Sequence, residues 1–312
     1  MRCWAFAVLL GLLLGSSSAC SRTTASSDAM RTLASDELAA LDAVLEEAGV
    51  APGNVVFHPE LYDLPWRGAE GHARAHGHTD AVDKIRKRQD DTRNAVAIQA
   101  GHVVGLRLGR TKLTRLSAFG KFPHLVVLDV HDSQIEDATG LSSLTELDHL
   151  DIAGNRVVTL AHIERLPALR SLYAAENGIE HIADLEALPA LEVLNLAGNR
   201  IGRIEGLSKL THLRALSLER NPIQRIEGLD ANVNLEELNL SYCWIGKIEN
   251  VTALTKLVRL NLWHNRIVHL EGVQGLSSLR YLGLGENPYD WRDAGNQAIM
   301  QTWAVGRLVA TL

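Results

Sequence analysis

Five residues near the start of this 312-residue sequence have the types and spacing that a metal site needs. They are His58, His72, His76, His78 and Asp80. Zinc would require three or four of these side chains to converge on one point. The loop-like composition around them favours instead a solvated polar loop. A metal-dependent hydrolase built on this segment is therefore the least favoured of three functional hypotheses.

A second polar group comes from three neighbouring repeats of the sequence and comprises Arg107, Asp129, His131, Asp132, His149 and Asp151. Placed on adjacent strands, Asp129 and Asp151 would lie about 4.8 Å apart. Two carboxylates at that distance repel each other unless a cation or a donor lies between them. Arg107 is the next residue of the same row, which favours an Arg–Asp–Asp row with hydrogen-bonding histidines. A cation site or a polar contact patch is the alternative.

No catalytic motif accompanies these groups. The sequence contains no H-E-x-x-H, G-x-S-x-G, G-x-x-x-x-G-K or C-x-x-C. We therefore expect a protein that is not an enzyme and that uses no cofactor and no metal. The formal net charge of −6 also gives no electrostatic reason to expect a nucleic-acid partner.

An internal repeat of 22 residues positions these side chains. Leucine recurs at this interval from Leu125 to Leu279, and Val103 extends the series one step earlier. The alternating Leu194 and Leu196 of one unit predict a short strand, and apolar residues spaced by three predict a 3₁₀ or irregular return path. A single unit cannot bury its apolar side, whereas stacked units share one continuous core. The sequence thus predicts an α/β solenoid, an arc with a parallel sheet on its concave face.

An asparagine follows the strand in most units, at Asn155, Asn177, Asn199, Asn221, Asn265 and Asn287. An amide side chain carries both donors and an acceptor, so it can satisfy backbone groups between neighbouring units. Thr111, Ser133 and Cys243 occupy the same place in three units. We interpret Cys243 as a packed structural substitute and not as a reactive thiol.

This pattern resembles the leucine-rich-repeat family, specifically its 22-residue class. That class includes the regulatory subunit of protein phosphatase 1 and the bacterial internalins. The recurring R-I-E-G-L at 203–207 and 225–229, with K-I-E-N-V at 247–251, looks closest to the phosphatase-regulator type. The resemblance implies a concave binding face but names no partner. A cytosolic phosphatase partner conflicts with the leader described below.

Aromatic and charged side chains are expected to project from the concave face in the later repeats. We predict a partner-binding surface that comprises Glu219, Arg220, Glu237, Tyr242, Arg259, Trp263, His264 and Tyr281. Tryptophan, tyrosine and arginine are the residue types that dominate binding energy at protein interfaces. The alternative is that Trp263 and Tyr281 only pack on each other and on the cap. Trp244 follows the asparagine place and should lie off this face.

Five segments are predicted along the chain. Residues 1–19 form a signal peptide and 20–30 a flexible tether. Residues 31–94 form a helical region or an enlarged cap, with helices from Ser35 or Asp36 to Ala48 and from Thr79 to Asn94. Residues 95–290 form about nine repeats, opened by a hairpin over 95–108. Residues 291–312 form a C-terminal helical cap.

The leader predicts export. An apolar run over residues 4–14 follows Arg2, and it is too short to span a bilayer as a helix. Small residues before Cys20 resemble a bacterial lipobox, although Ser17 stands where leucine is usual. We expect a lipoprotein of the bacterial cell envelope that meets the membrane only through a lipid on Cys20. Ordinary cleavage after Ala19 is the alternative.

The leading functional hypothesis is therefore an exported, monomeric scaffold that binds a protein partner on its concave face. Binding of a glycan or of cell-wall polymer, through rings that stack on sugars, is the second hypothesis.

Overall fold

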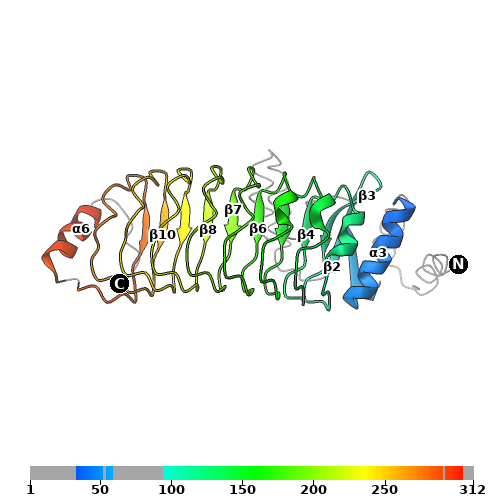
Figure 1. Cartoon of the computed structure of the whole chain (residues 1–312), viewed down its shortest axis with the longest axis horizontal. Helices are drawn as coiled ribbons and strands as arrows, with labels where there is room; N and C mark the ends of the chain where they lie inside the picture. The colour runs from blue at the N-terminus through cyan, green and yellow to red at the C-terminus, as the bar shows by residue number, and fades with distance from the viewer. Residues whose placement is uncertain (1–32, 52–53, 59–93, 291, 305–312) are drawn as a thin grey trace, which may run out of the picture.

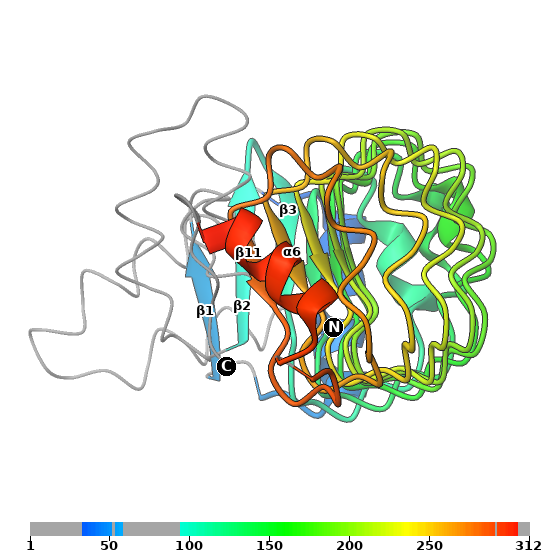
Figure 2. The ribbon, with the colours of Figure 1, turned by 90° about the vertical axis from the view of Figure 1, so that its left-hand side faces the viewer.

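The protein forms an elongated solenoid in which the strands lie side by side along one face and loops return along the other (Figures 1 and 2). The computed structural model describes residues 33–51, 54–58, 94–290 and 292–304. The α/β solenoid predicted from the repeat is confirmed. We refer to the strand-bearing side as the concave face.

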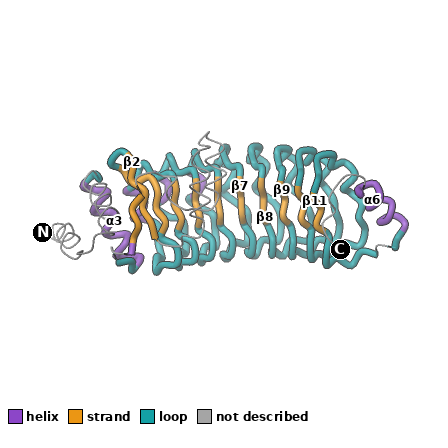
Figure 3. The backbone as a smooth tube through the Cα atoms, turned by 180° about the vertical axis from the view of Figure 1, so that it is seen from behind, coloured by secondary structure: helices purple, strands orange, loops and turns teal. Residues whose placement is uncertain are grey.

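Eleven strands form one sheet in chain order (Figure 3). They are β1 (Val55–His58), β2 (Asn94–Gln99), β3 (His102–Arg107), β4 (Val127–Asp129), β5 (His149–Asp151), β6 (Ser171–Tyr173), β7 (Val193–Asn195), β8 (Ala215–Ser217), β9 (Glu237–Asn239), β10 (Arg259–Asn261) and β11 (Tyr281–Gly283). Within the described residues only the β2–β3 pair is antiparallel, and it forms the hairpin predicted over 95–108, with its turn at Ala100 and Gly101. From β3 onward each residue pairs with the residue 22 positions later, for example Leu128 with Leu150.

The N-terminal end of the solenoid is closed by a helix. Helix α3 (Ser35–Ala48) is found where it was predicted, and Leu41, Val44 and Leu45 join the core. Its N-cap is Ala34, which makes no side-chain cap hydrogen bond. The buried carboxylate of Glu37 fixes the helix to the sheet: it accepts hydrogen bonds from the backbone N–H of Val103 (2.8 Å) and from His102 Nδ1 (2.9 Å).

Strand β1 was not predicted, because the sequence analysis placed helices up to Ala48 and from Thr79 to Asn94 and no strand between them. It pairs in parallel with β2, which extends the sheet by one strand beyond the hairpin. Val55 and Val56 have high strand propensity, but four residues are too few for a pattern that identifies a strand. The helix predicted from Thr79 lies outside the described residues except for Asn94, which instead opens β2.

One continuous apolar core runs through the repeats. The leucines that define the 22-residue period, from Leu125 to Leu279, are fully buried. The return path of the first three repeats contains one 3₁₀ helix each: η3 (Ser117–Lys121), η4 (Leu141–Ser143) and η5 (Ile163–Arg165). In later repeats it consists of irregular turns. Because each strand has only three residues in most repeats, the core depends on this stacking of units.

The asparagine row forms the hydrogen bonds that the sequence analysis assigned to it. In Asn221, Oδ1 accepts a hydrogen bond from the Ile201 N–H (2.9 Å), and Nδ2 donates to the carbonyls of Leu196 and Leu218. Cys243 replaces one asparagine, and its thiol donates to the Leu218 carbonyl at 3.5 Å. Burial raises the pKa of this thiol to about 11, which agrees with a structural role.

Contacts between neighbouring repeats on the loop side of the solenoid explain why the R-I-E-G-L sequence recurs. The arginine of one repeat forms an ion pair with the glutamate of the next, as in Arg203–Glu227 (3.0 Å) and Arg225–Glu249 (2.9 Å). Gly206 has φ 67°, and a Cβ there would overlap the carbonyl oxygen of the preceding repeat. Glycine therefore lets consecutive turns approach each other closely.

The C-terminal end is closed by helix α6 (Ala294–Ala304), as predicted (Figure 2). Asp293 caps it by accepting a hydrogen bond from the Asn296 N–H (3.0 Å), and the buried Asn296 amide accepts one from the Leu270 N–H (3.0 Å). Ile299 packs against the core. Neither this helix nor any other within the described ranges combines the length and apolarity needed to cross a bilayer.

Candidate binding surface on the concave face

An aromatic cluster occupies the concave face where β9 and β10 end. The rings of Tyr242 and His264 stack with centroids 4.7 Å apart, and Trp263 meets Tyr242 edge to face at 5.5 Å. Tyr242 and His264 have left-handed backbones with φ of 55° and 52°. Each lies in the turn that follows its strand, where the 22-residue period places one residue with a left-handed backbone in every repeat. Only glycine adopts this backbone without strain, so rings at these positions are held by the surrounding repeats.

Two arginines extend the cluster by stacking on tyrosines. The Arg220 guanidinium lies 5.0 Å from the Tyr242 ring centroid, and that of Arg259 lies 4.6 Å from the Tyr281 ring centroid. Carboxylates accompany both arginines, since Glu219 is 3.1 Å from Arg220 and Glu237 is 4.0 Å from Arg259. Cation–π contacts at exposed sites contribute about 0.5–1 kcal/mol each, so they hold the guanidinium planes in place without burying them.

A hollow of about 300 Å³ lies beside this cluster on the concave face. Its floor consists of small or amide side chains from β7 to β10, namely Val193, Asn195, Ala215, Ser217, Asn239 and Asn261. Tyr173 lines it from one end and Tyr281 with Arg259 from the other. A cluster of rings next to an open hollow is the arrangement that protein-binding surfaces use, because rings supply apolar contact and the hollow admits a side chain.

All eight residues of the predicted partner-binding surface lie on or beside the last strands of the concave face. Trp263 contacts Tyr242 and His264, whereas no ring contact joins Trp263 to Tyr281 among the described residues. The ring contacts of Trp263 are thus with Tyr242 and His264, and its packing on the cap stays the alternative to binding. Trp244 lies off this face as expected: it is 47% exposed, and the Arg266 guanidinium lies 5.2 Å from its ring.

Sequence reasoning missed the glycine that makes room for Trp263. A Cβ on Gly285 would overlap the indole of Trp263, so the absence of a side chain at this position seats the ring against β11. The same relation holds between Gly109 and the His131 ring. Gly285 lies 22 residues after Trp263, and Gly109 lies 22 residues before His131, so each glycine occupies the equivalent place in the neighbouring repeat, a signal that the repeat alignment contains.

The polar group of the first repeats is drawn together as the register requires. Arg107, Asp129 and Asp151 pair across β3, β4 and β5, and Arg107 Nε lies 3.3 Å from Asp129. The His131 ring donates a hydrogen bond of 2.5 Å to Asp129. Burial raises the pKa of Asp129, but that hydrogen bond and the charges of His131 and Arg107 outweigh it and hold the pKa below its ordinary value. The same hydrogen bond raises the pKa of His131 above its ordinary value, against the effect of burial.

The remaining members of this group differ in their exposure to solvent. His149 and Asp151 are fully buried, and His149 lies 5.3 Å from the Tyr173 ring. Asp132 is exposed and lies 3.5 Å from Arg110. Ligand atoms of Asp129, His131 and Asp151 lie within 4.8 Å of one another, which is the geometry that a cation site would need. Arg107 supplies positive charge to Asp129, as the predicted Arg–Asp–Asp row requires, and a cation site at these three residues stays the alternative prediction.

Of the first histidine group, only His58 is described, as the last residue of β1. His72, His76, His78 and Asp80 lie outside the described residues, as do the leader and Cys20.

Comparisons with known proteins agree with this architecture. Family models described as "Leucine Rich repeats (2 copies)" and "Leucine Rich repeat" match residues 189–231 and 231–247. Internalin C2 of Listeria monocytogenes is similar in structure, with a TM-score of 0.55, 27% identity, and coverage of 58% of this chain and 80% of that chain. A leucine-rich-repeat protein of Leptospira interrogans has a TM-score of 0.56 and 25% identity, covering 66% of this chain and 56% of its own. No curated protein sequence matches the chain.

The solenoid, its 22-residue register and these matches define the chain as a leucine-rich-repeat protein. Proteins of this class are typically scaffolds that bind other proteins and are generally not enzymes.

Proposed function

We propose that this protein is a non-enzymatic scaffold that binds a protein partner through the C-terminal half of its concave face. The observation that carries the proposal is the cluster of Tyr242, Trp263 and His264 beside an open hollow, with Arg220 and Arg259 stacked on tyrosines. Aromatic and arginine side chains cost little conformational entropy when they are already held in place, and they dominate interface energetics.

The exposure of side chains along the concave face also supports its C-terminal half as the binding surface. Asp129, His149 and Asp151 are buried in the first repeats, whereas Glu237, Arg259 and the rings of the last repeats are at least partly accessible. A macromolecular partner needs accessible side chains, so this difference in exposure supports the later repeats as the contact surface.

The test is affinity capture from the producing cell's envelope with the full chain as bait. A double variant, Trp263→Ala with Arg259→Ala, should lose the captured protein. Each substitution at an interface hot spot is expected to cost about 1–3 kcal/mol of binding.

The chain offers a matched control in Trp244 and Arg266, which form the same kind of ring–guanidinium pair off the concave face. The variant Trp244→Ala with Arg266→Ala should capture the partner as the wild type does. If both double variants retain the same protein, the partner binds elsewhere and the proposal is wrong.

A glycan is the second candidate ligand for the same surface. The observation that favours it is the floor of the hollow, where Asn195, Asn239 and Asn261 offer amides between Tyr173 and Tyr281. Amides bind sugar hydroxyls, and rings stack on sugar faces. A polysaccharide-binding panel separates the two candidates: retention of the chain on one polysaccharide, lost in the Tyr281→Ala variant, would establish the glycan.

We further propose that the protein is exported and anchored in the bacterial cell envelope by a lipid on Cys20. The apolar leader followed by small residues and a cysteine supports this. Metabolic labelling with a clickable fatty acid in a bacterial host should label the wild type and not the Cys20→Ser variant. Equal labelling of both would remove the anchor from the proposal.

A further inference from the structure

A row of alternating charges runs along one flank of the solenoid, at the residue that directly precedes each strand. Its members are Asp148, Arg170, Glu192, Arg214, Glu236, Val258 and Arg280, each 22 residues after the last. Arg170 lies 3.4 Å from Asp148 and 2.5 Å from Glu192, and Arg214 donates two hydrogen bonds of 3.1 Å to Glu236. Each of these arginines is therefore neutralised by a carboxylate from a neighbouring repeat.

Val258 interrupts this row. It places an uncharged, short side chain between Glu236 and Arg280, so Arg280 has no acidic neighbour of the kind that Arg170 and Arg214 have. Within the described part of the chain, no carboxylate forms an ion pair with Arg280 or with the nearby Lys256. The Lys256 Nζ donates instead to the neutral amide of Asn234 at 2.6 Å.

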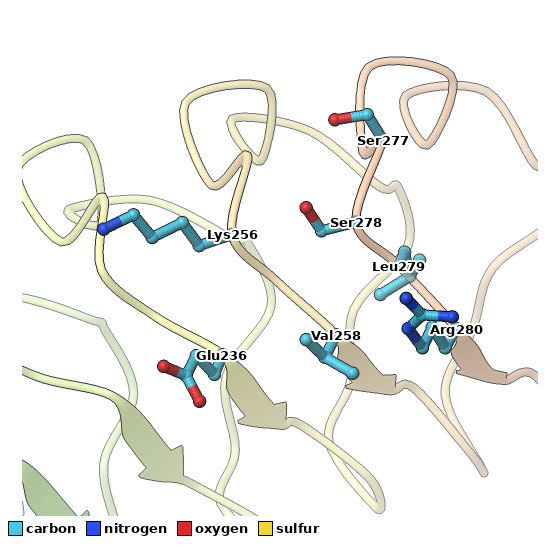
Figure 4. A pocket seen from close by; sticks show the side chains of 7 residues that line it. All are labelled: Glu236, Lys256, Val258, Ser277, Ser278, Leu279 and Arg280. Atoms are coloured by element: carbon cyan, nitrogen blue, oxygen red, sulfur yellow. The ribbon is translucent and has the colours of Figure 1, made fainter.

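A cavity of about 600 Å³ lies where the row is interrupted (Figure 4). Val258 lies at its centre with Arg280 on one side, Glu236 on the other, and Lys256, Ser277 and Ser278 above. This volume is within the usual range for ligand pockets. The one carboxylate that lines it, Glu236, is already held by two hydrogen bonds from Arg214. The charge that the cavity leaves without a counterion is therefore positive.

We infer that this flank cavity binds an acidic peptide segment, with one carboxylate taking the place beside Arg280 that Val258 leaves uncharged. A guanidinium recognises a carboxylate through two parallel hydrogen bonds, as Arg214 already does with Glu236. Lys256 lies on a different strand connection from Arg280, and the cavity is larger than one carboxylate requires. Both facts favour a segment with at least two neighbouring acidic residues over a single small anion.

This inference concerns a surface outside the concave face and does not depend on the partner proposed above. Its probe is a fluorescein-labelled peptide with three consecutive glutamates, compared with the same peptide containing three glutamines. Anisotropy titration of the full chain should show binding of the glutamate peptide only, and the affinity should fall as salt is raised.

Three variants locate the site. Arg280→Gln should weaken binding about tenfold, the usual effect of removing one charged hydrogen-bonded pair. Val258→Glu should weaken it comparably while removing no cation, because the new carboxylate would pair with Arg280. Arg200→Gln removes one exposed arginine away from the cavity and should leave the affinity unchanged. Far-ultraviolet circular dichroism and the melting temperature show whether each variant is folded.

Three results of the peptide titrations would overturn the inference. They are equal binding of the two peptides, equal affinity of the wild type and Arg280→Gln, or an equal loss in Arg280→Gln and Arg200→Gln. Displacement of the glutamate peptide by inorganic phosphate at constant ionic strength would show a site for any oxyanion, which also contradicts an acidic peptide as the ligand.

Discussion

Removing one amide from the asparagine row should destabilise the solenoid strongly. Asn221 is 2% exposed, and its Oδ1 is the acceptor for the buried backbone N–H of Ile201 at 2.9 Å. Its Nδ2 donates to the carbonyl of Leu196, which also accepts a hydrogen bond from Asn199. In an Asn221→Ala variant the Leu196 carbonyl therefore keeps one donor, whereas the Ile201 N–H loses its partner. The free energy of unfolding should fall mainly through that orphaned donor.

The magnitude follows from these contacts. A buried donor left without an acceptor costs about 1–3 kcal/mol, and each further lost hydrogen bond about 0.5–1.5 kcal/mol. The expected loss in the free energy of unfolding is about 3 kcal/mol. Cys243→Ala, at the equivalent place, should cost only about 1 kcal/mol, since its thiol is a weak donor and the Ile223 N–H already bonds to the Asn221 carbonyl.

Urea unfolding followed by circular dichroism measures both effects. The matched control is Asn234→Ala, which removes an amide that bonds to the Thr211 carbonyl on the exposed flank. Its cost should stay below about 0.5 kcal/mol, as for ordinary surface substitutions. If Asn221→Ala costs no more than Asn234→Ala, the asparagine row does not hold the repeats together and the reasoning is refuted.

Three further predictions concern single positions. Since the pKa of His131 is raised above 6.5, its contribution to stability is complete below that pH and is lost as the pH rises through the raised value. The stability difference between wild type and His131→Gln, from urea unfolding, should therefore shrink at alkaline pH; a constant difference would contradict the pair with Asp129. Cys243, with a thiol pKa of about 11, should resist a disulfide reagent at neutral pH in the native protein and react on unfolding. Fast reaction in the native state would show an accessible thiolate. Gly206→Ala should cost about 1–3 kcal/mol because φ is 67° and a Cβ overlaps the Ile182 carbonyl, whereas Gly202→Ala, in open space, should be neutral or slightly stabilising. Equal melting temperatures of these two variants would refute the steric argument.

Much of the candidate surface could be read from the sequence because a parallel register fixes neighbours. Once Leu128 and Leu150 are known to be equivalent, Asp129 and Asp151 must be adjacent. The same arithmetic places Arg259 beside Tyr281 on the last two strands. What the period cannot supply is the orientation of long side chains, such as the stacking of Arg259 on that tyrosine ring.

The sequence by itself determined the solenoid, the row of asparagines and the faces of the strands, because all three repeat every 22 residues and repetition turns spacing into position. The tertiary structure determined the features that do not follow from the 22-residue repeat. The parallel pairing of strand β1 and the anchoring of Glu37 to Val103 each join segments that no pattern links. The period places Val258 in its row, but the cavity there is a property of the folded surface. Burial likewise separates Asp129 from the exposed Arg259, although both occupy strands of one face, since exposure depends on everything that packs around a residue and not on its place in the repeat.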